Sequence, residues 1–189
     1  NYFNNINYVT IATTGDAIDF GDMSSVRGQP MTCASPTRAV VAGGNNGTTP
    51  HGVPQWKSIE YVTIATTGNS QAFGELRQGG ANNATGGCGS STRGIFLETS
   101  PGASNIISYI TIASFGNSVD FGERTVSKNE IATMSSDTRA VFGGAGAADT
   151  NVIDYVTIST TGNATDFGDL PVATWGYIAG CSDVHGGLG

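Results

Sequence analysis

Four copies of one sequence unit run through this 189-residue chain, and this repetition limits the possible folds more than any other feature. The copies are anchored by Tyr8, Tyr61, Tyr109 and Tyr155, which are 53, 48 and 46 residues apart. Each tyrosine is followed after seven residues by a glycine and after twelve residues by a Phe-Gly pair. Fixed internal offsets at such a period are typical of solenoids, propellers and arrays, in which neighbouring units bury each other's apolar faces.

Each unit has the composition of short β-strands. Residues 61–64 (Tyr-Val-Thr-Ile) are β-branched and aromatic and are apolar on both faces, which is typical of a strand between two layers. The Thr-Gly-Asn or Thr-Gly-Asp that follows predicts a hairpin turn, and the Phe-Gly pair lies in the next strand. A small-residue strand at 131–135 and an apolar strand at 138–144 complete the unit in the third copy. No segment has a sustained 3.6-residue period, so we predict sixteen strands and no helix.

Four short strands per unit, apolar on both faces, predict the blades of a β-propeller. Apolar strands that end in Gly-Gly, at 41–44 and 141–144, precede a Tyr strand and an aromatic strand, and this pattern resembles kelch-type repeats over essentially the whole chain. The chain departs from it where Leu97-Glu98 replaces the glycines and where phenylalanine stands in place of the kelch tryptophan. The motifs Tyr-Val-Thr-Ile-Ala-Thr-Thr-Gly-Asn and Asp-Phe-Gly-Asp are similar to repeats in structural proteins of phages that infect aquatic cyanobacteria. That resemblance implies a virion fibre or a similar appendage.

The repeat predicts one domain over residues 1–189 in which one blade is split between the two ends of the chain. Residues 1–24 and 172–189 form the split blade, and the other blades cover about 25–77, 78–125 and 126–171. If the two halves meet within one molecule, they close a four-bladed ring. If they meet in neighbouring molecules, they form a head-to-tail polymer. The sequence leaves both assemblies open.

The chain is weakly charged, with 12% charged residues, 28 glycines and a net charge of −7. A surface rich in hydroxyl and amide groups favours an extracellular or virion location. The eight Lys and Arg residues argue against a nucleic-acid partner and against binding to an anionic membrane surface. No apolar run is as long as a transmembrane helix, so we expect no membrane insertion.

Charged residues recur once in each copy. Acidic residues follow every Phe-Gly pair, at Asp22, Glu75, Glu123 and Asp169, and a second column is basic, at Arg38, Arg93, Arg139 and His185. Carboxylates in pairs act in glycoside hydrolysis or bind calcium, and these remain the alternatives. Recurrence with the scaffold instead favours one structural Arg–carboxylate contact per blade, partly buried. We therefore expect no cofactor, with a bound calcium ion as the lesser alternative.

The three cysteines also occupy a repeated position. Cys33, Cys88 and Cys181 precede the basic column, where the third copy has Met134. A column that accepts cysteine and methionine is typical of apolar packing. The odd number and the absence of a Cys-x-x-Cys spacing argue against a disulfide framework and against a zinc site.

The long loop at 45–58 interrupts the repeat and contains His51, Gln55 and Trp56. Long loops on rigid scaffolds often carry binding residues. An aromatic face beside amide donors predicts a sugar-binding site, and a tryptophan that merely caps the ring edge is the alternative reading.

The sequence contains no nucleophile elbow, no His-x-x-x-His pair and no Walker-type loop, so we expect no enzyme. The leading hypothesis is a structural or adhesive protein of a virion fibre or extracellular filament, with copies of itself or other appendage proteins as partners. A glycan-binding, lectin-like propeller that recognises surface glycans is the alternative. A glycosidase is disfavoured because no carboxylate pair stands outside the repeat.

Overall fold

The computed structural model describes residues 3–45, 57–78, 86–99, 104–145, 150–174 and 179–182. These residues form fourteen β-strands and no helix, so the predicted all-β class is confirmed. Accordingly, the described part of the chain has no helix suited to crossing a membrane.

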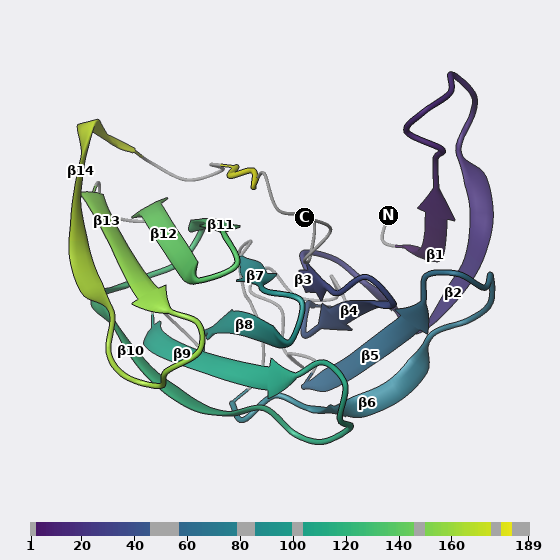
Figure 1. Ribbon diagram of the computed structural model, residues 1–189, viewed down its shortest axis with the longest axis horizontal. Helices are drawn as coiled ribbons and strands as arrows, with labels where there is room; N and C mark the ends of the chain where they lie inside the picture. Colours follow the sequence, from purple (N-terminus) through teal and green to yellow (C-terminus); the bar gives the residue numbers. More distant parts are fainter. Residues whose placement is uncertain are drawn as a thin grey trace.

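The strands form four antiparallel sheets, which we number in chain order and which follow one another in an open arc (Figure 1). Sheet 1 contains β1 (Phe3–Tyr8) and β2 (Ile18–Arg27). Sheet 2 contains β3 (Met31–Ala34), β4 (Arg38–Ala42), β5 (Ser58–Thr63) and β6 (Gln71–Glu75). Sheet 3 contains β7 (Gly87–Gly89), β8 (Arg93–Glu98), β9 (Ser104–Thr111) and β10 (Val119–Lys128). Sheet 4 contains β11 (Ala132–Ser135), β12 (Arg139–Ala145), β13 (Thr150–Thr157) and β14 (Thr165–Thr174).

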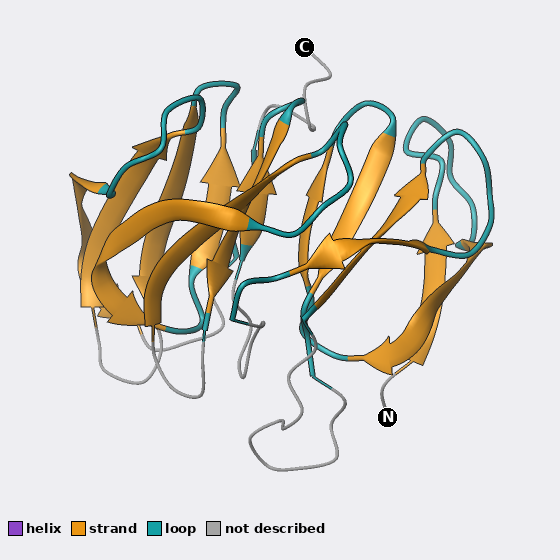
Figure 2. Ribbon diagram, turned by 90° about the horizontal axis from the view of Figure 1, so that it is seen from below, coloured by secondary structure: helices purple, strands orange, loops and turns teal. Residues whose placement is uncertain are grey.

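Within sheets 2 to 4 each strand pairs with the next in sequence, from β3, β7 and β11 on the inside of the arc to β6, β10 and β14 on the outside (Figure 1). Figure 2 shows the sheets standing side by side, with most connecting turns gathered at the ends of the strands. This arrangement is compatible with that of propeller blades.

The Phe-Gly pair marks a β-bulge in every copy. The register of the last two strands skips one residue in each sheet, and the skipped residues are Phe20, Phe73, Phe121 and Phe167. A bulge turns the extra side chain and bends the strand. Each phenylalanine therefore meets the tyrosine of the neighbouring strand edge-on, with ring centroids 5.8–6.2 Å apart.

The hydrophobic core lies between the faces of adjacent sheets. One cluster joins Ile59 and Phe73 of sheet 2 to Phe96 and Ile112 of sheet 3. A second cluster joins the other face of sheet 3 to sheet 4, with Phe142 fully buried. Sheet 3 is thus covered on both faces, as expected for strands without a polar face.

The inner strands lie side by side, and residues 179–182 continue their series. Ser135 on β11 donates its hydroxyl to the carbonyl of Gly89 on β7, 46 residues earlier (2.8 Å). Its backbone N–H donates to the hydroxyl of Ser182, 47 residues later (2.8 Å). Residues 179–182 therefore occupy the next inner position after β11. The two strands expected at 172–189 lie largely outside the described residues, and closure of a ring stays a prediction.

Adjacent sheets are joined by a repeated set of hydrogen bonds, which we call the inter-sheet junction. In the first junction the N–H groups of Gly68 and Ser70 donate to the carbonyls of Phe20 and Asp22 (2.7 and 2.9 Å). The N–H of Asp22 in turn donates to Oδ1 of Asn69 (3.0 Å). The Phe-Gly-acid segment of one sheet's outer strand thus binds the turn that follows the Tyr strand in the next sheet.

Two further junctions repeat this geometry with bond lengths of 2.8–3.1 Å. They join Phe73 and Glu75 to Gly116, Asn117 and Ser118, and Phe121 and Glu123 to Gly162, Asn163 and Ala164. The glycine after each of these phenylalanines is required by contact, because a Cβ there would overlap the carbonyl of the next sheet's turn.

Replacing Gly122 by alanine should destabilise the protein more than replacing Gly168, although the two φ angles are similar, 149° and 141°. Both variants carry the strain of a positive φ, about 1–3 kcal/mol. Only a Cβ at Gly122 meets the junction, where it would overlap the carbonyl of Gly162, and this overpacking adds about 1–3 kcal/mol. Urea denaturation of dilute, monomeric protein measures the difference. Equal losses in the two variants would contradict the role assigned to the junction.

Candidate functional site

The residues predicted to bind a ligand, His51, Gln55 and Trp56, lie outside the described residues, and so does His185 of the basic column. The structure therefore leaves the sugar-binding prediction untested. The remaining predicted columns and the inside of the arc are described and can be compared with expectation.

Among the described residues, Arg38, Arg93 and Arg139 form no ion pair with the acidic column, so the predicted Arg–carboxylate pairing is wrong for these three. Nη1 of Arg38 instead donates to the carbonyl of Ile112 in sheet 3 (2.6 Å), and Nη1 of Arg93 donates to the carbonyl of Ile158 in sheet 4 (2.9 Å). Three guanidinium groups stack on tyrosine rings of their own sheets at 4.5–4.9 Å from the centroids: Arg38 on Tyr61, Arg93 on Tyr109 and Arg139 on Tyr155. All three arginines therefore make cation–π contacts within their own sheet, and Arg38 and Arg93 also bind a carbonyl of the following sheet.

The acidic column contributes its backbone rather than its charge. The side chains of Glu75, Glu123 and Asp169 are exposed, and that of Asp22 is half-buried. In the three junctions it is the N–H and carbonyl of this residue that bind the next sheet. An exposed carboxylate tolerates either Asp or Glu, which explains why both occur in the column.

The charged side chains that do connect adjacent sheets belong to residues outside the predicted acidic and basic columns. Five charged side chains are buried in the described part of the chain: Arg27, Glu60, Glu98, Arg124 and Asp154. All five lie in contacts between adjacent sheets, one contact at each junction.

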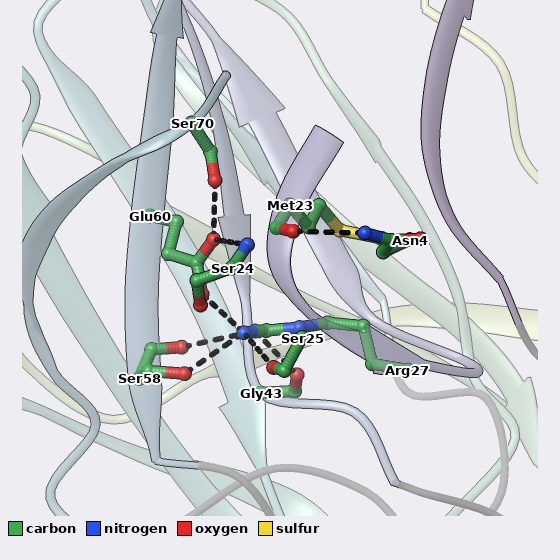
Figure 3. A network of polar contacts seen from close by, with 9 residues as sticks. All are labelled: Asn4, Met23, Ser24, Ser25, Arg27, Gly43, Ser58, Glu60 and Ser70. Atoms are coloured by element: carbon green, nitrogen blue, oxygen red, sulfur yellow. Dashed lines mark hydrogen bonds and ion pairs between the residues drawn. The ribbon is translucent and has the colours of Figure 1, made fainter. Parts of the chain in front are cut away.

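At the first junction, Glu60 on β5 is the centre of a polar network with β2 (Figure 3). It accepts hydrogen bonds from the N–H and the hydroxyl of Ser24 (3.0 and 2.5 Å), from the hydroxyl of Ser70, and from the guanidinium of Arg27. Arg27 also donates to the carbonyl of Gly43 (3.1 Å). One carboxylate therefore ties the outer strand of sheet 1 to the middle of sheet 2.

Burial by itself raises the pKa of the Glu60 carboxyl, because it disfavours the charged form. The hydrogen bonds from Ser24 and Ser70 and the charge of Arg27 act in the opposite direction and prevail. The pKa of Glu60 accordingly lies below its ordinary value of 4.5. The carboxylate is held in its ionised form as an acceptor.

The third junction has an equivalent network around Asp154 on β13. Arg124 donates from Nε and Nη2 to Oδ1 of this aspartate (3.1 and 2.9 Å). Thr125 donates its N–H and its hydroxyl to Oδ2 (2.9 and 2.8 Å). Thr125 and Ser24 hold the same repeat position, four residues after the phenylalanine, whereas Arg124 and Arg27 do not. The guanidinium therefore reaches the carboxylate from two different positions.

The second junction obtains its carboxylate from another strand. Ser108 stands where the neighbouring sheets have Glu60 and Asp154, and Glu98 at the end of β8 takes over their role. Its donors are the backbone N–H groups of Arg77 and Gln78 and the hydroxyl of Ser118, at 3.2, 2.6 and 2.9 Å. The departure from the Gly-Gly pattern at Leu97-Glu98 thus places an acceptor where the repeat would otherwise lack one.

A cavity of about 420 Å³ lies between the inner strands and is lined by all three cysteines. Cys33 and Cys88 are buried free thiols, and Cys181 is an exposed free thiol. Burial raises the pKa of Cys88 to about 12 and that of Cys33 further still. Thiols that stay protonated are poor nucleophiles and poor metal ligands. The surroundings of Cys33 and Cys88 match apolar packing positions.

Within the described ranges, no three His, Cys, Asp or Glu side chains gather as metal ligands would. Comparison of the chain with protein-family models finds no match, and no curated protein matches it. The kelch-like and phage-protein resemblances therefore rest on the sequence repeat alone.

Replacing Asp154 by asparagine should lower the free energy of unfolding by about 3–5 kcal/mol, because the buried guanidinium of Arg124 loses its counter-charge. The matched control is Asp120→Asn. The Asp120–Arg77 pair has side-chain exposures of 64% and 38%, whereas the Asp154–Arg124 pair has 0% for both. The control should change stability by about 0–1 kcal/mol. Similar losses from both substitutions, measured by urea denaturation, would argue against a structural role for the buried pair.

The low pKa of Glu60 predicts a pH dependence of stability. The folded protein protonates Glu60 less readily than the unfolded chain does, so the stabilisation is complete above a pH of about 4.5 and is lost as the pH falls through the folded-state pKa. Glu60→Gln should therefore be less stable than wild type at neutral pH, and the difference should shrink in acid. Urea midpoints across this pH range test the expectation. A difference that does not change with pH would refute it.

Proposed function

We propose that this protein is a non-enzymatic structural repeat protein of a virion fibre or extracellular filament. In this proposal it is a β-propeller of kelch-like repeats with one blade split between the two ends of the chain. The observation that supports the proposal most is that all five buried charged side chains of the described part hold adjacent sheets together.

Catalytic sites keep charged groups available in a cleft, where a substrate can reach them. Here the buried carboxylates of Glu60, Glu98 and Asp154 each accept three or four hydrogen bonds from the chain itself. Such groups contribute to a rigid scaffold and have at most one acceptor position each left for a substrate. A rigid, weakly charged scaffold suits a building block that must keep its shape outside the cell.

One observation favours the glycan-binding alternative. Two equivalent hollows, of about 260 and 340 Å³, lie beside the turns that follow Tyr61 and Tyr155. Each is lined by a tyrosine, threonine hydroxyls and the turn asparagine, a combination that offers an aromatic ring and polar groups to a sugar. A lectin-like role would use these repeated hollows on the same scaffold.

Immunogold electron microscopy with an antibody against the purified chain tests the leading proposal on material from the producing host. We expect gold particles along fibres or filaments outside the cell. Labelling confined to the cell interior would overturn the proposal. A glycan array separates the two candidates, since binding that is lost when Thr67 and Thr161 are replaced by bulky residues would favour the lectin-like role.

A further inference from the structure

One half of an inter-sheet junction is unoccupied at the outer edge of sheet 4. Phe167, Gly168 and Asp169 repeat the Phe-Gly-acid segment, yet no atom of the described residues lies within 4 Å of the Cβ position at Gly168. Phe167 is 54% exposed, whereas its three counterparts are 2–9% exposed. We call residues 167–169, together with Arg139, the tail surface.

The complementary half is unoccupied in sheet 1. Gly15, Asp16 and Ala17 repeat the turn that binds the Phe-Gly-acid segment, and in the described part of the chain no atom lies within 4 Å of the Cβ position at Gly15. Ile11, just before this turn, is 95% exposed, whereas its counterparts Ile64, Ile112 and Ile158 are 45%, 1% and 2% exposed. We call Ile11 with residues 15–17 the head surface.

A third contact connects the same two surfaces. Arg38 and Arg93 each donate to the carbonyl of the isoleucine at this position in the next sheet. Arg139 is the next member of that column and Ile11 is the next isoleucine. The guanidinium of Arg139 stacks on Tyr155 but makes no hydrogen bond within the described part of the chain, and the side chain is exposed.

We propose that a second copy of this chain docks head to tail, with its head surface on the tail surface of the first copy. The N–H groups of Gly15 and Ala17 donate to the carbonyls of Phe167 and Asp169, and Asp169 donates its N–H to the carboxylate of Asp16. Arg139 donates to the carbonyl of Ile11. The three interior junctions supply the geometry, and the two surfaces lie at opposite ends of the open arc (Figure 1).

Such an interface is heterologous, so it propagates into a filament or closes into a ring of several copies. It completes a pairing of strand edge and turn that each copy leaves open, a form of recognition in which main-chain hydrogen bonds provide much of the affinity. The inference rests on the proposed structural function and names the partner that the building block would bind.

Two variants block one surface each without disturbing buried groups. Phe167→Asp places a charge on the tail surface opposite Asp16, and Ile11→Arg places one on the head surface opposite Arg139. Val119→Asp is the control, because Val119 is similarly exposed, at 53%, but lies on β10, away from both surfaces. Far-UV circular dichroism and thermal unfolding establish that all three variants fold.

Sedimentation velocity over a range of concentrations should show wild type and Val119→Asp associating, and each blocked variant as a monomer. An equimolar mixture of Phe167→Asp and Ile11→Arg should form a dimer and nothing larger, because only one intact tail–head pair is available per two chains. The blocked variants should each raise the dissociation constant by about tenfold or more.

A wild type that stays monomeric, or a mixture of blocked variants that stays monomeric, would overturn the inference. A monomeric wild type whose unfolding temperature falls in both blocked variants would show that the two surfaces meet within one chain. These outcomes are separate from the proposed function. If the chain is a monomer in solution but the antibody still labels fibres, only the head-to-tail interface is refuted. If the chain associates in solution but the antibody labels no fibres, only the proposed function is refuted.

Discussion

The structure depends on the hydrogen bonds by which the turn of one sheet binds the bulged outer strand of the sheet before it. Each sheet has at most four strands, and its apolar faces are buried only if the neighbouring sheet is held at a fixed distance. The carbonyls of Phe20 and Asp22 would otherwise be unpaired at a strand edge. The close approach of Gly21 to the turn at Gly68 leaves no room for a Cβ. This one contact explains why the offsets from tyrosine to glycine and from tyrosine to Phe-Gly are constant.

The buried carboxylates follow from the same contact. Beyond the bulge, the outer strand turns N–H groups such as those of Ser24 and Thr125 toward the next sheet, where Glu60 and Asp154 are buried. A buried carboxylate needs hydrogen-bond donors, and an ionised acceptor forms the stronger hydrogen bonds. Glu60 and Asp154 supply it from the residue before the tyrosine, and Glu98 supplies it from the end of a different strand. The structure therefore requires a carboxylate at this place between the sheets, whichever position of the sequence supplies it.

The difference between features fixed by the local sequence and contacts fixed only in space determines which parts of the structure could be predicted from the sequence. Repeated offsets and β-branched strands predicted the all-β class, because local composition and register decide both. The pairing of Arg38 with the acidic column was wrong, because recurrence in two columns was taken as contact, while a tyrosine ring and a carbonyl of the next sheet lay closer. The network around Glu98 was missed because it departs from the repeat. Its one signal was that Glu98 appears in the same copy in which Ser108 replaces an acid.

The ends of the arc differ from the interior in the groups that a buried carboxylate would need. Asn7 stands in sheet 1 where Glu60 and Asp154 stand in sheets 2 and 4, and Pro171, which has no N–H, stands where Ser24 and Thr125 donate theirs. An interior junction forms once, as the chain folds, so the desolvation of its carboxylate is compensated permanently by donors of the same chain. A junction between separate molecules would desolvate that carboxylate at every encounter and expose it at every dissociation, at a cost of several kcal/mol. Neutral groups at these two positions avoid that cost, so the proposed interface would rely on main-chain hydrogen bonds, on apolar contact and on the exposed side chains of Asp16 and Arg139. The neutral groups at the two ends thus suit the proposed contact between separate molecules, whereas the buried carboxylates of the interior suit contacts that form once within a chain.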